Sequence, residues 1–318
     1  MNQAEIVNVV QTAEWLYLLY INYEEGDVAS AVGSVYRVRA GGPDATDRLE
    51  RVLGTGDTLR SLWLSPEGNL WVSSADGFVG TTASVPWTIP SGLTYDTEAG
   101  PTWSATALPR LRADGLRPNI TTLWGTGDND VFAGTYGGHI YHWNGQDWRQ
   151  AHDAGPDYTV TLLAFGGTGP HDVFAVGTGG TLLHFDGQGW RPLQVPGAPA
   201  NETLTAVAPL PDGTVFISAS GNAGRLLHGT AAALTEFTTT PLSLVDMATL
   251  GDRVLFATGD GVGELFGKDI QVIKSNFKTS RLSAGLGRVY FIEPARPTPS
   301  FIVHDPADTE GQWWRTEF

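Results

Sequence analysis

Residues 125–149 read GTGDNDVFAGTYGGHIYHWNGQDWR, and residues 167–191, 42 positions later, read GTGPHDVFAVGTGGTLLHFDGQGWR. The two copies share an Asp-Val-Phe-Ala run, a double glycine, a histidine and a tryptophan. A period of about 40 residues, made of short strands and glycine turns, is typical of a β-propeller in which each repeat forms one four-stranded blade. The sequence therefore predicts an all-β propeller.

The hydrophobic strand at 131–133 and 173–175, followed by a Gly-rich turn, recurs five more times along the chain, at 15–19, 70–73, 215–218, 254–257 and 289–292. Asn-Gly and Asp-Gly pairs at 144–145 and 186–187 are strong signals for a hairpin between the third and fourth strands of a unit. We predict one domain, a seven-bladed propeller, with six or eight blades as the alternatives. The expected blade limits are 1–55, 56–117, 118–155, 156–199, 200–238, 239–275 and 276–318.

The two ends of the chain each supply a complete unit. A first strand is expected at 5–10 and a last strand at Trp313 and Trp314, so the ring should close by packing between the first and last blades. Long turns are expected at 22–32 and 293–300, and the second unit carries an insertion at 84–103.

The bulk composition narrows the function classes. The 318 residues include no cysteine, which excludes disulfides, thiolate metal sites and a cysteine nucleophile. A formal charge of -15 repels phosphate backbones and anionic lipids, so we expect neither nucleic acid nor a membrane as partner. The N-terminus lacks a basic stretch followed by an apolar run, and no window reaches the length of a membrane span, so we expect a cytoplasmic protein.

The units resemble the bacterial WD40/YVTN/BNR-like group of propeller repeats. Residues 172–190 carry its pattern through Asp172-Val173-Phe174-Ala175, Gly180, His184, Asp186-Gly187 and Trp190. In part the units are also kelch-like, since a double glycine is present and Tyr141 precedes Trp148 at the kelch spacing. The resemblance covers two units well and the other five in outline, and it implies a fold rather than an activity.

Residues that recur at equivalent positions should build the blade. We assign His142, His184 and His228 to structural hydrogen bonds, and we expect the recurring aspartates at 130, 172, 212 and 252 to cap turns by accepting backbone N–H groups. No G-x-S-x-G, H-E-x-x-H or phosphate-loop motif is present, so no catalytic residue and no metal ligand is predicted.

A binding site is then expected where the copies differ, in the turns between second and third strands and in the links between blades, which share one face of the disc. The candidate partner-binding residues are Glu24, Glu25, Asp27, Asp76, Phe78, Tyr136, His139, Arg225, Asp260 and Arg296. Four or five acids among them predict an acidic face.

The favoured function is a non-catalytic, protein-binding propeller: an acidic cytosolic inhibitor or immunity protein that neutralises a basic partner, such as a secreted bacterial toxin of a type VI system. The first alternative is a calcium-dependent hydrolase of the lactonase or glycosidase type, with the ion held by Asp or Glu in the central channel. Otherwise no cofactor is expected. The second alternative is a glycan-binding lectin that stacks sugars on Trp87, Trp103 or Tyr136.

Overall fold

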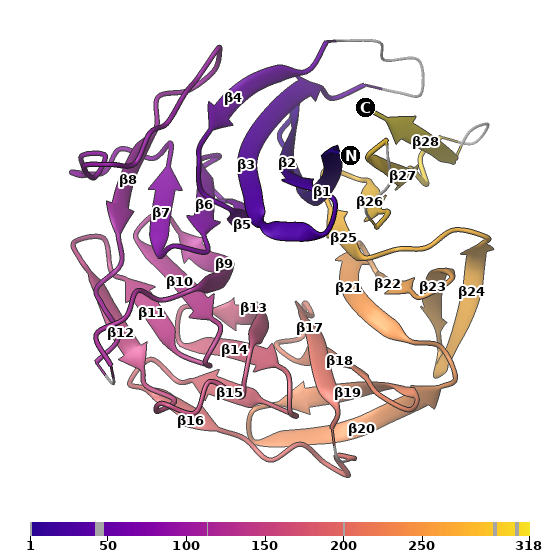
Figure 1. Cartoon of the computed structure of the whole chain (residues 1–318). Helices are drawn as coiled ribbons and strands as arrows, with labels where there is room; N and C mark the ends of the chain where they lie inside the picture. The colour runs from indigo at the N-terminus through magenta and orange to yellow at the C-terminus, as the bar shows by residue number, and fades with distance from the viewer. Residues whose placement is uncertain (1, 42–47, 113, 200, 295–297, 309–311) are drawn as a thin grey trace.

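The computed structural model describes residues 2–41, 48–112, 114–199, 201–294, 298–308 and 312–318. These residues form 28 strands in seven four-stranded antiparallel sheets, arranged as blades around a central channel (Figure 1). No helix occurs in the described ranges, and hence none there that could cross a membrane. The predicted all-β, seven-bladed fold is confirmed.

Each blade is a meander of four consecutive strands, and the first strand lies innermost (Figure 1). The inner strands are β1 (Asn2–Gln11), β5 (Leu59–Leu64), β9 (Ile120–Gly127), β13 (Leu162–Gly169), β17 (Thr203–Pro209), β21 (Leu244–Leu250) and β25 (Arg281–Ala284). The second strands are β2 (Trp15–Glu24), β6 (Leu70–Ser74), β10 (Asp130–Thr135), β14 (Asp172–Gly177), β18 (Val215–Ser220), β22 (Arg253–Thr258) and β26 (Val289–Ile292).

The third strands are β3 (Asp27–Arg39), β7 (Phe78–Thr81), β11 (Ile140–Trp143), β15 (Leu182–Phe185), β19 (Gly224–Thr230), β23 (Gly261–Phe266) and β27 (Ser300–His304). The outer strands are β4 (Glu50–Gly54), β8 (Ser104–Ala107), β12 (Trp148–His152), β16 (Trp190–Pro192), β20 (Ala233–Thr240), β24 (Asp269–Ser275) and β28 (Trp313–Glu317). The second strands are the recurring hydrophobic runs of the sequence. They are almost wholly buried because neighbouring blades cover both of their faces.

Turn chemistry sets the register of each meander. In blade 3, Gly145 adopts a φ of +86°, and the Asn144 side chain accepts the backbone N–H groups of Gln146 and Asp147, each at 3.0 Å. A residue with a side chain pays a steric penalty at this positive φ. The Asn-Gly pair therefore fixes Trp143 opposite Trp148, and with it the side of the sheet that each residue of the outer strand faces.

The hydrophobic core consists of layers between blades. Seven apolar clusters are found among the described residues, one at each junction between neighbouring blades. The cluster that closes the ring joins Ile6 and Leu18 of blade 1 to Ile292 and Phe301 of blade 7. Each terminal blade takes its four strands from one end of the chain. The ring therefore closes by packing between blades, as predicted.

The recurring histidines have structural partners. His142 Nε2 lies 2.6 Å from Asp130 Oδ1, and His184 Nε2 lies 2.7 Å from Asp172 Oδ1. A threonine hydroxyl, from Thr126 or Thr168, donates to the other oxygen of each aspartate. The expectation that Asp130 and Asp172 cap turns through backbone N–H groups was wrong, because these carboxylates instead link the second and third strands through side chains.

Two irregular regions lie on blades 1 and 2. Most of residues 22–32 belong to strands rather than to a long turn: β2 and β3 pair Asn22 with Val32 and again Glu24 with Asp27, with a register shift between these pairs, and the chain turns around Gly26. The insertion at 84–103 packs on blades 1 to 3. Its Trp87 ring lies 4.8 Å from that of Trp143, and the buried Trp103 donates its indole N–H to Val52 O at 2.8 Å.

Candidate functional site

The inner strands line the central channel with one free edge each. Six of them carry a β-bulge near their start, where one extra residue interrupts the pairing with the second strand. The extra residues are Val7, Arg60, Thr121, Leu163, Thr205 and Val245, and all of them line a cavity in the channel. Strand β25 is regular, and it places Arg281 in the channel.

Two cavities together run along the channel. The larger one has a volume of about 590 Å³ and the one toward the starts of the inner strands about 420 Å³. They share Leu163, Ser280 and Arg281, so Arg281 stands where the two cavities meet. These volumes fall within the range of small-molecule sites.

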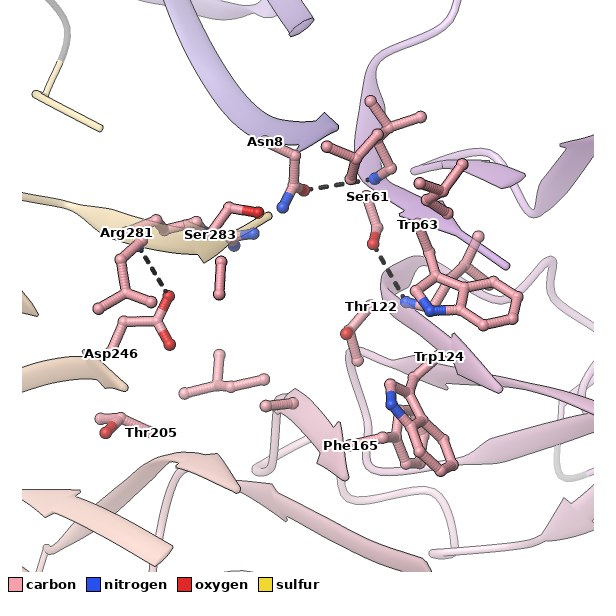
Figure 2. Close-up of a pocket in the computed structure, with 18 of the residues that line it drawn as sticks. Asn8, Ser61, Trp63, Thr122, Trp124, Phe165, Thr205, Asp246, Arg281 and Ser283 are labelled. Carbon is pink, nitrogen blue, oxygen red and sulfur yellow. Dashed lines mark hydrogen bonds between the residues drawn. The ribbon is translucent and has the colours of Figure 1, made fainter. Parts of the chain in front are cut away.

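The larger cavity has two unlike walls. Trp63, Trp124 and Phe165 of blades 2 to 4 form one side, which we call the aromatic wall (Figure 2). On the other side, the polar wall comprises Asn8, Asp246, Arg281 and Ser283 of blades 1, 6 and 7 (Figure 2).

Three polar side chains join neighbouring inner strands. Asn8 Oδ1 accepts the N–H of Leu62, Ser61 Oγ that of Leu123, and Asp246 Oδ2 that of Leu282 (Figure 2). Asn8, Ser61 and Asp246 each directly follow the bulge of their strand in blades 1, 2 and 6. Asp246 thus makes with a carboxylate the same kind of hydrogen bond between inner strands that Asn8 makes with an amide and Ser61 makes with a hydroxyl.

Burial dominates the electrostatics of the acids in the channel. It raises the pKa of Asp246 to about 6, against the opposing effect of the N–H groups of Leu282 and Met247 and the charge of Arg281. Burial also raises the pKa of Glu5, although the charges of Arg281 and Arg60 oppose it. A carboxylate with a pKa near neutrality is a group that can change its charge under physiological conditions.

Four of the predicted site residues are exposed acids on two neighbouring blades. Glu24, Glu25 and Asp27 are exposed at the tip of the β2–β3 hairpin, and Asp76 is exposed in the turn between β6 and β7. The link from blade 1 to blade 2 contacts both blades, since Gly33 N donates to Asp57 O at 2.8 Å, and the charge of Asp76 adds to burial in raising the pKa of Asp57.

Other predicted residues lie apart. Tyr136 is 47% exposed and lines the cavity toward the starts of the inner strands. The Arg117 guanidinium lies over the half-buried Phe78 ring, 4.7 Å from its centre. Asp260 is exposed in blade 6, away from blades 1 and 2, and Arg296 falls outside the described residues (Figure 1).

The prediction that His139 and Arg225 belong to a partner-binding surface was wrong, because both side chains are buried inside the blades. His139 is fully buried, and its Nδ1 accepts the N–H of Ala154 at 3.2 Å. Burial lowers the pKa of His139, against the nearby charge of Asp153. Arg225 is 5% exposed and makes ion pairs with Glu202 and Glu236, at 2.7 Å and 2.9 Å. Neither side chain is presented to a partner on the surface.

Sequence reasoning missed the channel residues. Asp246, Arg281 and Arg60 lie on first strands, which the repeat assigns to the scaffold. A usable signal was present for Arg60, because the other bulged strands place Val, Thr or Leu at its position. Asp246 is likewise a charged residue at a position where blades 1 and 2 have the uncharged Asn8 and Ser61. Trp63 and Trp124, which the sequence analysis did not single out, also line the cavity.

The channel cavities contain neither a histidine nor a cluster of candidate metal ligands among the described residues. None of the seven histidines, all of which are described, lines either channel cavity. The described part of the chain holds no group of three or more His, Cys, Asp or Glu placed to bind a metal ion, so the calcium alternative gains no ligand set. Burial also removes Trp103 as a sugar-stacking surface.

No protein-family model and no curated protein matches the sequence. Solved structures match the fold. The virginiamycin B lyase of Staphylococcus aureus is 12% identical, with a TM-score of 0.59 over 82% of this chain and 83% of that one. YCF48 bound to D1 peptide is 15% identical, with a TM-score of 0.60 over 92% and 89%. The WD40 propeller domain of Doa1 is 11% identical, with a TM-score of 0.57 over 92% and 94%.

These comparisons agree with the observed fold. The protein is a β-propeller, and its fold is similar to that of WD40 propellers such as the Doa1 domain. Because the identities are only 11% to 15%, the similarity is evidence for the fold and not for a shared function.

Proposed function

We propose that this protein is a non-catalytic binding module that holds a basic segment of a partner protein on the face where the links between blades arrive. The observation that carries the proposal is the β2–β3 hairpin, whose tip is closed by the pair Glu24 and Asp27 and exposes three acids, Glu24, Glu25 and Asp27. Asp57 and Asp76 of blade 2 extend this set, and we call the five residues the acidic rim.

The physical argument rests on charge and placement. The chain has 34 acidic and 19 basic residues, so a basic partner is attracted at long range. The acidic rim then gives that attraction a defined surface, carried by a hairpin of paired backbone. Among the solved neighbours, YCF48 is bound to a peptide, which is in keeping with a propeller as a protein-binding module.

The finer form of the proposal is an inhibitor or immunity protein that acts in the cytoplasm and blocks a basic toxin, for example one secreted by a type VI system. The virginiamycin B lyase structures, one of them a catalytically inactive histidine-to-alanine variant with quinupristin, give a propeller enzyme for comparison. Since no histidine of this chain lines the channel, we do not advance a hydrolase or lyase function.

The test compares two triple variants that each remove three negative charges. Glu24→Gln, Glu25→Gln and Asp27→Asn neutralise the hairpin tip. The control combines Glu67→Gln, Asp252→Asn and Asp269→Asn, which lie in exposed turns on the opposite face of the disc. We expect a basic protein that co-purifies with the wild type to bind the hairpin variant at least tenfold more weakly and the control nearly unchanged. Equal losses would mean that net charge, not the acidic rim, governs binding.

A further inference from the structure

Arg281 is a cation without a close counter-ion. It lines both channel cavities, and within the described ranges its side chain makes no hydrogen bond and no ion pair within 4.0 Å. Other arginines of the same blades are paired: Arg253 Nε lies 2.7 Å from Glu264, and Arg288 Nε lies 2.7 Å from Asp305. A planar guanidinium can donate two parallel hydrogen bonds to one carboxylate. The Arg281 side chain, which has no ion-pair partner among the described residues, can therefore bind a carboxylate.

The acids near Arg281 are occupied elsewhere. Asp246 Oδ1 accepts the N–H of Met247 at 2.8 Å, and its Oδ2 accepts that of Leu282 at 3.1 Å. Glu5 lies on blade 1, between Arg60 of blade 2 and Arg281 of blade 7, and it interacts with both charges. Neither acid is within ion-pair distance of Arg281, so an incoming anion need not break an existing pair.

Three further groups of the larger cavity can donate hydrogen bonds to an anion. Since Asn8 Oδ1 is used by Leu62 N–H at 3.3 Å, the Asn8 amide turns its two N–H bonds away from that contact (Figure 2). On the aromatic wall, the indole nitrogens of Trp63 and Trp124 lie on the side of each ring toward the cavity (Figure 2). Neither indole N–H has an acceptor among the residues that the structure describes.

We propose that the channel binds an oxygen-rich carboxylate, with one carboxylate held by Arg281 and Asn8 and further oxygen acceptors held by the indole N–H groups of Trp63 and Trp124. Two sources present this chemistry: a free dicarboxylic or hydroxycarboxylic acid, and the free C-terminus of a peptide, whose backbone carbonyls supply the other acceptors. The proposal uses the channel and not the acidic rim, so it stands apart from the proposed function.

The experiment titrates the intact protein by calorimetry and by NMR of the indole N–H signals. Succinate tests the free acid, with succinamide as its neutral match. Trialanine with a free carboxylate tests the peptide source, with its C-terminal amide as control. We expect one of the two acids to bind and to shift the Trp63 and Trp124 signals, while both amides fail. If amides and acids act alike, or if no acid binds, the proposal is wrong.

Substitutions then test whether Arg281 is the residue that binds the carboxylate. Arg281→Met should weaken binding of the acid by at least tenfold, the usual range for a lost charge-assisted hydrogen bond. Arg60→Met removes the same charge at the exposed mouth and should cost less than threefold. Asp246→Asn removes a nearby negative charge and should tighten binding several-fold. Unchanged binding in Arg281→Met, with an unaltered unfolding curve, would overturn the assignment.

Discussion

The two walls of the central channel are built on inner strands of different blades, and they are stabilised differently. The aromatic wall is continuous with the core: Phe165 is 6% exposed and packs on Phe132 and Trp190 at ring distances of 6.1 Å and 5.9 Å. The polar wall instead contains the half-buried, ionisable Asp246 and Arg281. One wall is therefore part of the packing between blades, and the other presents charged groups to the channel.

Of the substitutions in the two walls, truncation of an aromatic-wall side chain should lower the free energy of unfolding the most. Phe165→Ala removes a buried ring from the junction between blades 3 and 4 and is expected to lower the free energy of unfolding by about 3 kcal/mol. Urea unfolding followed by tryptophan fluorescence measures this change. A loss below about 1 kcal/mol would show that the aromatic wall is not part of the core.

The polar wall should respond to pH through Asp246. Burial raises its pKa from 3.8 to about 6, so the folded state binds the proton more tightly than the unfolded state. Wild-type stability should then fall as pH rises from about 4 to about 6 and stay lower above that range. Asp246→Asn keeps an acceptor for Leu282 and should be more stable than wild type by about 1 to 3 kcal/mol at pH 7.5.

At pH 4 the carboxyl is protonated in the folded state, so the advantage of Asp246→Asn should nearly vanish. Unfolding curves of both proteins at the two pH values provide the measurement. An advantage that is equal at pH 4 and pH 7.5 would point to packing rather than to ionisation.

A smaller effect should be common to both walls, because each uses a side chain to hold the next inner strand. Ser61→Ala removes the acceptor of Leu123 N–H, and Asn8→Ala removes that of Leu62 N–H. Each substitution is expected to cost about 1 kcal/mol. Native-state hydrogen exchange should show faster exchange at the affected N–H; protection as in the wild type would argue against these bonds.

The smallest effect is expected for Arg281→Met, which should change the free energy of unfolding by less than about 0.5 kcal/mol, since Arg281 has no partner within ion-pair distance among the described residues. Ser283→Ala, on the same strand, serves as the matched control in thermal unfolding. A loss of about 2 kcal/mol or more for Arg281→Met alone would make Arg281 a structural residue and remove the contrast between the walls.

The repeat predicted much of the scaffold because it is a local pattern. The seven hydrophobic runs are the second strands, the Asn144-Gly145 turn lies where expected, and His142 and His184 are structural. The position of a residue in or next to a turn did not predict whether its side chain is exposed. His139 and Arg225 follow the Gly-rich turns of blades 3 and 5, yet both are buried, since side-chain direction depends on register and on the neighbouring blade.

By itself, then, the sequence determined an all-β ring of seven blades, because hydrophobic period and turn residues act over a few positions along the chain. Only the tertiary structure decided what meets in the channel. Asn8, Arg60, Asp246 and Arg281 are far apart in sequence, and they come together because closing the ring turns seven inner strands toward one axis, while a bulge in six of them shifts which side chain faces it. The cavity, its two walls and the open guanidinium of Arg281 are consequences of that closure.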